Sequence, residues 1–303
     1  MATTTMKERN IKKVSEEQKI LNVFATILRY LFLSLVAVAV LFPFYWMIIS
    51  SLKSYTEYKL SIPTFWPKEV LWGNYSEAFT AGNLGRYFGN TVIVGLISTV
   101  LSLVVTVLSA FAFARLEFKG KNIMFAALLA TMMIPGELFT ITNYITVNAF
   151  GWMGSDGLVQ GFLSLIFPFL VSVFYIYLLR QNFLQIPNSL YLAAKVDGTS
   201  DLKYLWKVMI PLAMPTLVSI TILKMMGAWN SYMWPRLVAN DEMHKMVTNG
   251  LRSVSFLVEG SSTDINYPVQ MAAVAIVSAP LFIVFIFFRK YIMKGVSKSG
   301  TKG

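Results

Sequence analysis

The sequence predicts an all-α polytopic membrane protein with six transmembrane helices. Three observations support this fold class. Hydrophobic residues make up 56% of the 303 positions and charged residues only 14%, which excludes an ordinary soluble domain and a disordered chain. Apolar runs close to bilayer length recur six times along the chain. Lys and Arg gather in alternate connecting segments, as the positive-inside rule predicts for a multi-pass protein.

Each apolar run is long enough for one crossing, because a hydrocarbon core of about 30 Å needs roughly 20 helical residues. The first run is too long for the core of a signal peptide, so we expect a retained anchor. Pro135-Gly136 interrupts the third run and makes it the least regular of the six. The six runs span 26–50, 91–114, 123–145, 158–179, 208–229 and 268–288.

The distribution of charge predicts the orientation of these spans. If both termini are cytoplasmic, the internal segments carry 18 Lys and Arg residues and the external loops carry 7. The net charge of +11 is therefore a topology signal, and we expect membrane lipids, and no nucleic acid, as partners. The expected organisation is a cytoplasmic segment at 1–25, a six-span domain at 26–290 and a cytoplasmic tail at 291–303, in the inner or plasma membrane of the cell.

The sequence contains no pattern typical of a catalytic or metal site. Cysteine is absent, which excludes a disulfide framework and a thiolate metal site. The only histidine, His244, falls in an expected external loop at 235–267 and is interpreted as an ordinary loop residue without a partner. There is no GxxxxGK[ST] loop, so the chain lacks the backbone amides that would hold ATP phosphates. We expect no enzyme activity, no metal site and no cofactor in this chain.

Small and hydroxyl-bearing residues recur along the second span at spacings of three and four. Such a stripe lets neighbouring helices approach closely and hydrogen-bond within a bilayer. We interpret it as a helix-packing face, and lining a polar pathway is the alternative. The stripe consists of Gly95, Ser98, Thr99, Ser102, Thr106 and Ser109.

The segment 190–215, LYLAAKVDGTSDLKYLWKVMIPLAMP, differs from the apolar runs around it. It is amphipathic, and the charge pattern places it in the cytoplasm. Its order indicates a short helix, a turn and a second helix. Gly198 can adopt the left-handed conformation that ends a helix, and Asp197 can cap the turn. Asp201 lies near the start of the second helix, where the helix dipole favours a carboxylate.

The first of these helices has features of a docking element. Ala193 and Ala194 leave room for the walls of a groove on another protein. Tyr191 and Val196 supply apolar anchors at helical spacing. This pattern is typical of a helix that binds in a groove. The alternative is an ordinary amphipathic loop.

Together, AA-x-x-DG and the following IPL-x-x-P resemble the "EAA" coupling loop in the membrane subunits of ATP-driven importers. The resemblance implies a coupling loop at about 188–212 that docks into a cleft of an ATPase subunit. The matching positions are Ala193, Ala194, Asp197 and Gly198. One position departs from the pattern, because Leu192 stands where the family usually has Glu. A charged contact to the ATPase is then missing or supplied by another residue such as Asp201.

Further motifs along the chain resemble the carbohydrate-importer branch of that family. They are similar to the shorter permease subunit of the maltose and oligosaccharide transporters. The motifs are FPFYWMIISSLK, SAFAFARLEFKGKN, MMIPGE, GAWNSYMWP and the tail FFRKYIMKGVSKSGTKG.

The resemblance implies a permease subunit that imports a sugar or oligosaccharide by alternating access. The implied partners are a second permease subunit, an ATPase dimer that carries ATP and Mg²⁺, and an extracellular or periplasmic sugar-binding protein. An importer of the same class for glycerol phosphodiesters or sugar phosphates remains open. An ion-driven secondary transporter also remains open, but it would leave the amphipathic docking loop unexplained.

Two charged residues lie within the predicted spans. Glu137 and Lys224 each cost roughly 2.5–3.5 kcal/mol near a helix centre on insertion scales, so we expect them to face the bundle, a cavity or each other. One hypothesis is an intramembrane pair between them. In a second, Lys224 binds a sugar hydroxyl or a substrate carboxylate. In a third, Glu137 reaches the external interface.

Sugar sites combine aromatic faces with polar groups, and both types occur near the external ends of two spans. The candidates are Trp229, Asn230 and Tyr232 at the fifth span and Asn143 and Tyr144 at the third. For Trp234 we prefer a place in the aromatic belt at the membrane interface. The substrate could also lie mainly on the partner permease.

Overall fold

The computed structural model describes residues 2–239 and 241–297. Helices dominate these residues, and they contain no strand beyond a single antiparallel bridge between Leu257 and Ile265. Six segments have the length and composition needed to cross a membrane, if each bent pair of helices is taken as one span. The all-α fold class predicted from the sequence is confirmed.

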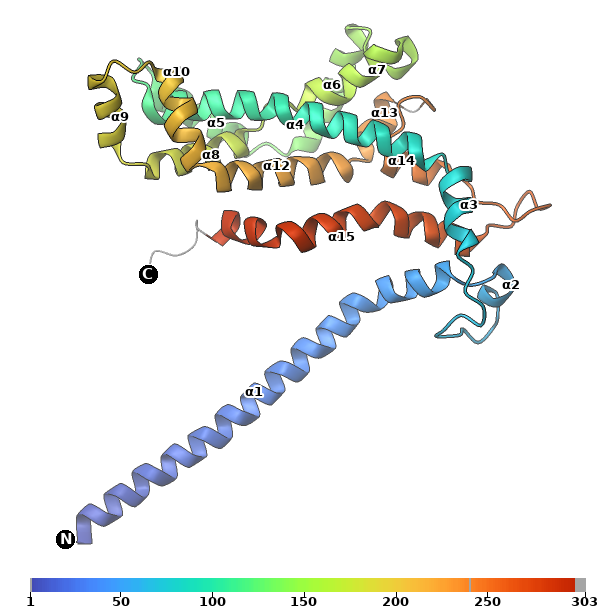
Figure 1. Ribbon diagram of the computed structural model, residues 1–303, viewed down its shortest axis with the longest axis horizontal. Coiled ribbons are helices and arrows are strands. Elements are labelled where there is room, and N and C mark those ends of the chain that lie inside the picture. The colour runs from blue at the N-terminus through green and yellow to red at the C-terminus, as the bar shows by residue number, and fades with distance from the viewer. Residues whose placement is uncertain (1, 240, 298–303) are drawn as a thin grey trace.

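Three of the six spans are unbroken helices. They are α1 (Ala2–Ser51), α4 (Leu84–Arg115) and α15 (Tyr267–Ser297). In Figure 1, α1 runs away from the other helices, and only its C-terminal part lies near the end of α15 that is joined to α14. In this part of α1, the ring of Phe44 meets the ring of Phe282, halfway along α15, edge to face with the centroids 5.1 Å apart. Between residues 21 and 48, α1 thus presents apolar side chains to its surroundings.

The other three spans are each bent at a break, with bends of 83°, 52° and 80°. Proline explains all three positions, because it lacks a backbone N–H donor and disfavours helix at the preceding residue. Pro135 lies in the first break, Pro168 lies just before the second, and Pro215 opens the helix after the third.

The bent spans comprise the following elements. The first contains α5 (Lys121–Thr131), η1 (Gly136–Leu138), α6 (Phe139–Ala149) and η2 (Gly154–Asp156). The second contains α7 (Leu158–Ile166), η3 (Phe167–Phe169) and α8 (Val173–Gln185). The third contains α10 (Asp201–Tyr204), the π-helical turn η4 (Leu205–Met209), α11 (Ile210–Leu212) and α12 (Met214–Trp229). The remaining helices are α2 (Tyr55–Tyr58), α3 (Gly73–Ala81), α9 (Asn188–Val196), α13 (Met233–Val238) and α14 (Val247–Ser253).

The two ends of the bundle carry different elements. Figure 1 places α9 and α10 at one end, together with the start of α1 and the end of α15. It places α2, α3 and α14 toward the opposite end. The chain's first and last helices therefore begin and finish on the side where the 190–215 segment lies.

Helix α4 is central, packing against α8, α12, α14 and α7. Its small and hydroxyl-bearing face is buried, while the apolar side chains on its other face are exposed. Gly95 brings α12 close, because a Cβ at this position would lie 3.2 Å from the side chain of Met225. The stripe is therefore a packing face over most of its length, and Ser98 within it also lines a cavity between the helices.

Buried side chains form three clusters along the bundle. One lies near α9 and α10 and includes Phe111, Phe183 and Tyr204. A second joins α3, α4, α14 and α15 and includes Tyr87 and Trp229. The third joins α4, α6, α7 and α13.

The 235–267 segment is more than the expected loop, because it includes the helix α14 and hydrogen-bonds to α4. The side-chain amide of Asn90 on α4 donates to the carbonyls of Met243 at 2.8 Å and Lys245 at 2.9 Å. The amide of Val247 donates to Thr91 Oγ1 at 2.8 Å. Polar side chains of α4 thus fix the path of this segment.

His244 lies within this segment, and its interpretation as a loop residue without a partner is wrong. The side chain is 2% exposed. Its Nδ1 lies 2.8 Å from the Asp241 carboxylate, and its Nε2 lies 2.8 Å from the carbonyl oxygen of Leu158 at the start of α7. The ring also packs edge-on against Phe162. His244 therefore joins the segment to α7.

Candidate functional site

The 190–215 segment forms a helix pair whose turn is closed by backbone hydrogen bonds. The amide of Thr199 donates to the carbonyl of Ala194 at 2.8 Å, and that of Gly198 donates to Lys195 at 3.0 Å. This pair of bonds is the Schellman pattern that ends a helix. Gly198 has a φ of +68°, and nothing lies within 4 Å of the place where a Cβ would be. The prediction that Gly198 ends the helix in the left-handed conformation is confirmed.

A cluster of side chains connects the two helices of this pair. The hydroxyl of Tyr191 donates to Asp201 Oδ1 at 2.7 Å, and Lys195 Nζ lies 2.7 Å from the same oxygen. The hydrogen bond to Asp201 raises the pKa of Lys195. Burial, and then the bond to Asp201, raise the pKa of Tyr191. Asp201 therefore already has two partners in its own chain.

The faces of α9 are divided between the chain's own core and the surroundings. Tyr191 and Ala194 pack against the buried cluster near α10, with the Tyr191 and Tyr204 rings 5.2 Å apart. Tyr191 thus faces inward, whereas the sequence analysis predicts that it is an apolar anchor for a partner protein, like Val196. Ala193 and Asp197 are exposed.

Exposed apolar side chains occur on both helices of the pair. Val196 is 88% exposed, and Leu192 is 57% exposed. Leu202 and Trp206 on the second helix are also exposed. Large apolar groups held outward at the end of a bundle indicate a contact surface for another molecule. We call Leu192, Val196, Leu202 and Trp206 the docking face.

A buried arginine connects the helix pair to α4, and the sequence analysis missed it. Arg115, the last residue of α4, donates from Nη2 to the carbonyls of Phe183 and Ile186 at the end of α8. Its Nη1 lies 3.5 Å from Oδ1 of Asn188, the first residue of α9. A cation here satisfies the last free carbonyls of α8. Its place in the SAFAFARLEF motif was the only signal in the sequence.

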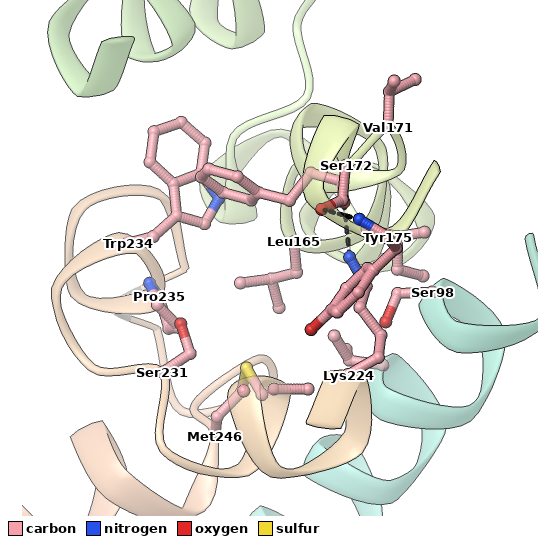
Figure 2. A pocket seen from close by; sticks show the side chains of 15 residues that line it. Ser98, Leu165, Val171, Ser172, Tyr175, Lys224, Ser231, Trp234, Pro235 and Met246 are labelled. Atoms are coloured by element: carbon pink, nitrogen blue, oxygen red, sulfur yellow. Dashed lines mark hydrogen bonds between the residues drawn. The ribbon is translucent and has the colours of Figure 1, made fainter. Parts of the chain in front are cut away.

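A cavity of about 360 Å³ lies between α4, α7, α8, α12 and α13. Figure 2 shows Ser98, Tyr175 and Lys224 on one side of it and Ser231, Trp234 and Pro235 on the other. Lys224 Nζ donates to the carbonyl oxygen of Phe169 at 2.5 Å. The complete lining is Val94, Ser98, Leu165, Ile166, Phe169, Val171, Ser172, Tyr175, Lys224, Gly227, Ala228, Ser231, Trp234, Pro235 and Met246.

Among the pathway candidates from the sequence, Lys224 is the one that lines this cavity. Trp229 is 9% exposed, donates from Nε1 to the carbonyl of Val277 at 3.2 Å and packs against Phe88. The amide of Asn230 donates to the Met226 carbonyl of its own helix. Tyr232 lies beside arginine side chains near the end of α12.

The remaining pathway candidates also lie outside the cavity. Asn143 and Tyr144 are on α6, where Asn143 is half-buried and Tyr144 is exposed. Glu137 is exposed in η1, and the ion pairs of the described residues do not include one with Lys224. The hypothesis of a Glu137–Lys224 pair is therefore not supported.

Trp234 lies in the cavity wall, which corrects its predicted place in an interfacial aromatic belt. It is 6% exposed and donates from Nε1 to the carbonyl of Ser164 at 2.9 Å. Its ring meets Phe169 edge to face, with the centroids 5.3 Å apart. The hydroxyl groups of Ser172 and Tyr175 at the cavity were also missed, because nothing in their sequence context distinguishes them. Among the described residues, no group of three or more His, Cys, Asp or Glu side chains could hold a metal ion.

Known proteins resemble this chain over most of its length. The arabinooligosaccharides transport system permease protein AraQ of Bacillus subtilis (strain 168) is 29% identical over 280 residues, which cover 90% of this chain and 94% of that protein. The diacetylchitobiose uptake system permease protein NgcG of Streptomyces coelicolor is 29% identical over 263 residues, covering 86% and 84%.

The fold also matches a solved structure, a chain of a bacterial ABC transporter involved in the import of the acidic polysaccharide alginate. The TM-score is 0.77 at 23% sequence identity, and the match covers 88% of this chain and 95% of that chain. Residues 102–298 match the family described as binding-protein-dependent transport system inner membrane component. That match includes the helix pair, most of the cavity lining and the last span, so the chain belongs to this family of transport permeases.

Proposed function

We propose that this chain is one of two permease subunits of an ATP-driven importer whose cargo is a sugar or oligosaccharide. The relatives AraQ and NgcG, both named for oligosaccharide uptake, support the carbohydrate cargo. The chain contributes half of the pathway, and partner ATPase subunits carry ATP and Mg²⁺ and perform the hydrolysis. A second permease subunit and an external sugar-binding protein complete the importer.

The geometry of the helix pair carries this proposal. Four large apolar side chains are held outward, while the inward side of the pair is fixed by the Schellman turn and by the bonds to Asp201. A rigid apolar docking face suits insertion into a groove, because little ordering entropy is lost on binding. Arg115 connects the helix pair to α4 and gives its movement a route into the bundle.

The cycle that follows is alternating access. Closure of the ATPase dimer brings the two coupling loops together, and the permease pair opens outward to accept the sugar from its binding protein. Hydrolysis resets the pair. This orientation places the helix pair and both termini in the cytoplasm of a multi-pass inner or plasma membrane protein. The charge distribution supports it, as does the position of α9 and α10 on the same side as the start of α1 and the end of α15 (Figure 1).

An ion-driven transporter fits the described residues less well. It would need carboxylates at the membrane midplane, in positions that ions can reach. No Asp or Glu lines the cavity, and Glu137 is exposed in η1.

The test is Val196→Asp in the complete importer, purified in lipid with its binding protein. Val196 touches little of its own chain, so the fold should tolerate the change, but docking of the variant would bury an unpaired carboxylate. We expect the sugar-dependent increase in ATP hydrolysis to fall at least about 10-fold, or the ATPase subunits to be lost from the complex.

The control is Lys119→Asp, which also adds a carboxylate, on the exposed turn between α4 and α5. It should keep normal stimulation. Normal stimulation in Val196→Asp as well would show that the helix pair does not couple the chain to an ATPase.

A further inference from the structure

The cavity carries a single charge. Lys224 is the one charged side chain among its lining residues, and no Asp or Glu is among them. The ammonium group has three N–H donors, and the one hydrogen bond found for Lys224 is with the neutral carbonyl of Phe169. The cation is therefore half-buried without a counter-charge, a costly arrangement unless an anion joins it.

Two more uncompensated cations lie at the end of the bundle where α12 leads into α13. The guanidinium of Arg252 lies 4.6 Å from the centre of the Tyr232 ring, and that of Arg236 lies 5.8 Å from it. Arg236 Nη1 also donates to the Tyr232 hydroxyl at 2.6 Å. Hydrogen bonding, first to Arg252, lowers the pKa of Tyr232. Both arginines are exposed, and the ion pairs of residues 2–239 and 241–297 include neither.

These cations belong to the same part of the fold as the cavity. Tyr232 directly follows Ser231, which lines the cavity, and Arg236 directly follows the wall residue Pro235. Cations inside and near a half-enclosed cavity whose lining contains no carboxylate raise the local concentration of anions. Hydroxyl groups of Ser98, Ser172 and Tyr175 are available inside for a polyhydroxylated ligand.

We propose that this cavity selects an anionic sugar or polyol, whose carboxylate or phosphate binds Lys224, and that Arg236 and Arg252 add to its attraction for anions. The inference rests on the proposed importer function and specifies that the cargo carries an acidic group. The shared chemistry is a small hydroxylated anion, so a uronic acid and a polyol phosphate both satisfy it. An acidic surface on the binding protein would account for the exposed arginines, but it would leave the Lys224 cation in the cavity unexplained.

The experiment measures equilibrium binding to the complete importer in lipid nanodiscs, with the binding protein omitted. Two matched pairs of tritiated probes are dialysed against it: digalacturonate with neutral galactobiose, and glycerol 3-phosphate with glycerol. The first pair tests a carboxylate and the second tests a phosphate. We expect the anionic member of at least one pair to bind about 10-fold more tightly than its neutral partner, the effect of one charge-assisted hydrogen bond.

Variants locate the charge that produces this preference. Lys224→Gln should abolish it, whereas Lys224→Arg should retain it and show that the cavity still folds. Arg252→Gln should reduce the preference for the anionic probe less than Lys224→Gln does. Added salt should weaken the contribution of Arg252, because this arginine is exposed. Lys59→Gln is the control, since Lys59 is an exposed cation 3.8 Å from Asp264 and remote from the cavity lining.

Equal binding within both pairs, including no binding of any probe, would overturn the proposal, as would a preference that survives Lys224→Gln. In each case Val196→Asp still reports on the importer function separately. Arg252→Gln could leave binding of all probes unchanged and only raise the binding-protein concentration needed for half-maximal ATP hydrolysis. In that case the arginines bind the binding protein. Their part in substrate selection is then refuted.

Discussion

Asp201 connects the two helices of the helix pair, and its removal should make α9 open more often. Asp201→Ala deletes the acceptor of the Tyr191 hydroxyl and the counter-ion of Lys195 at once. The Tyr191 bond is half-buried, and a protein hydrogen bond contributes about 1 kcal/mol net. The Lys195 pair is solvent-exposed and its contribution is screened by salt. We therefore expect about 5-fold more frequent opening of α9, from the hydrogen bond alone.

Hydrogen–deuterium exchange of the α9 amides in the lipid-embedded importer measures this opening directly. Tyr191→Phe should reproduce most of the effect, because it removes the same bond and keeps the ring on Tyr204. Lys203→Met is the matched control, an exposed cation of α10 that forms no ion pair in the described part of the chain.

The ion pair should not change near neutral pH. The bond between Lys195 and Asp201 raises the pKa of Lys195 and lowers that of Asp201, so the pair is fully present at neutral pH. It is lost as the pH rises through the raised value of Lys195 or falls through the lowered value of Asp201. Exchange in the wild type should therefore be insensitive to pH, after correction for the intrinsic rate, from about pH 6 to about pH 8. If Asp201→Ala and wild type exchange at equal rates in α9, the helix pair is held by its turn and core contacts, and the reasoning is refuted.

Two further predictions concern the turn and the link to α4. Gly198→Val should lower the sugar-dependent ATP hydrolysis, because a β-branched residue at φ +68° costs at least about 1–2 kcal/mol. Gly198→Asn should be nearly normal, since Asn tolerates this conformation. Equal activities of the two variants would show that the turn conformation does not matter. Arg115→Met should leave two carbonyls of α8 without their donor and uncouple hydrolysis from transport, measured as ATP consumed per sugar imported. Lys121→Met, which removes the pair with the exposed Glu117, should not change this ratio. An unchanged ratio in Arg115→Met would exclude Arg115 from transmission.

Much of the helix pair could be predicted from its own sequence. The Ala pair, Asp197 and Gly198 specify a helix end through local backbone preferences, and these act over five or six residues whatever surrounds them. The orientation of Tyr191 could not be predicted in the same way. An aromatic residue on an amphipathic helix can face its own core or a partner, and the position of Tyr204 decides between them.

The cavity was less predictable than the spans that form it. Lys224 was identified because a charge within an apolar run has to be explained. The other polar side chains in the lining come from α4, α8 and the segment after α12, and single hydroxyl groups in apolar helices carry no distinguishing signal. His244 gave a misleading signal, since its partners Asp241 and Leu158 depend on how the 235–267 segment folds back.

The sequence by itself determined that the chain is helical, has six segments able to span a membrane and carries an amphipathic helix pair in a positively charged connecting segment. These properties follow from composition, run length and local turn chemistry, each of which acts within one segment. Only the tertiary structure decided which spans bend, that Arg115 connects the helix pair to α4, and that Lys224 faces a cavity without a carboxylate. Those features depend on contacts between helices distant in sequence, and packing of the whole bundle sets these contacts.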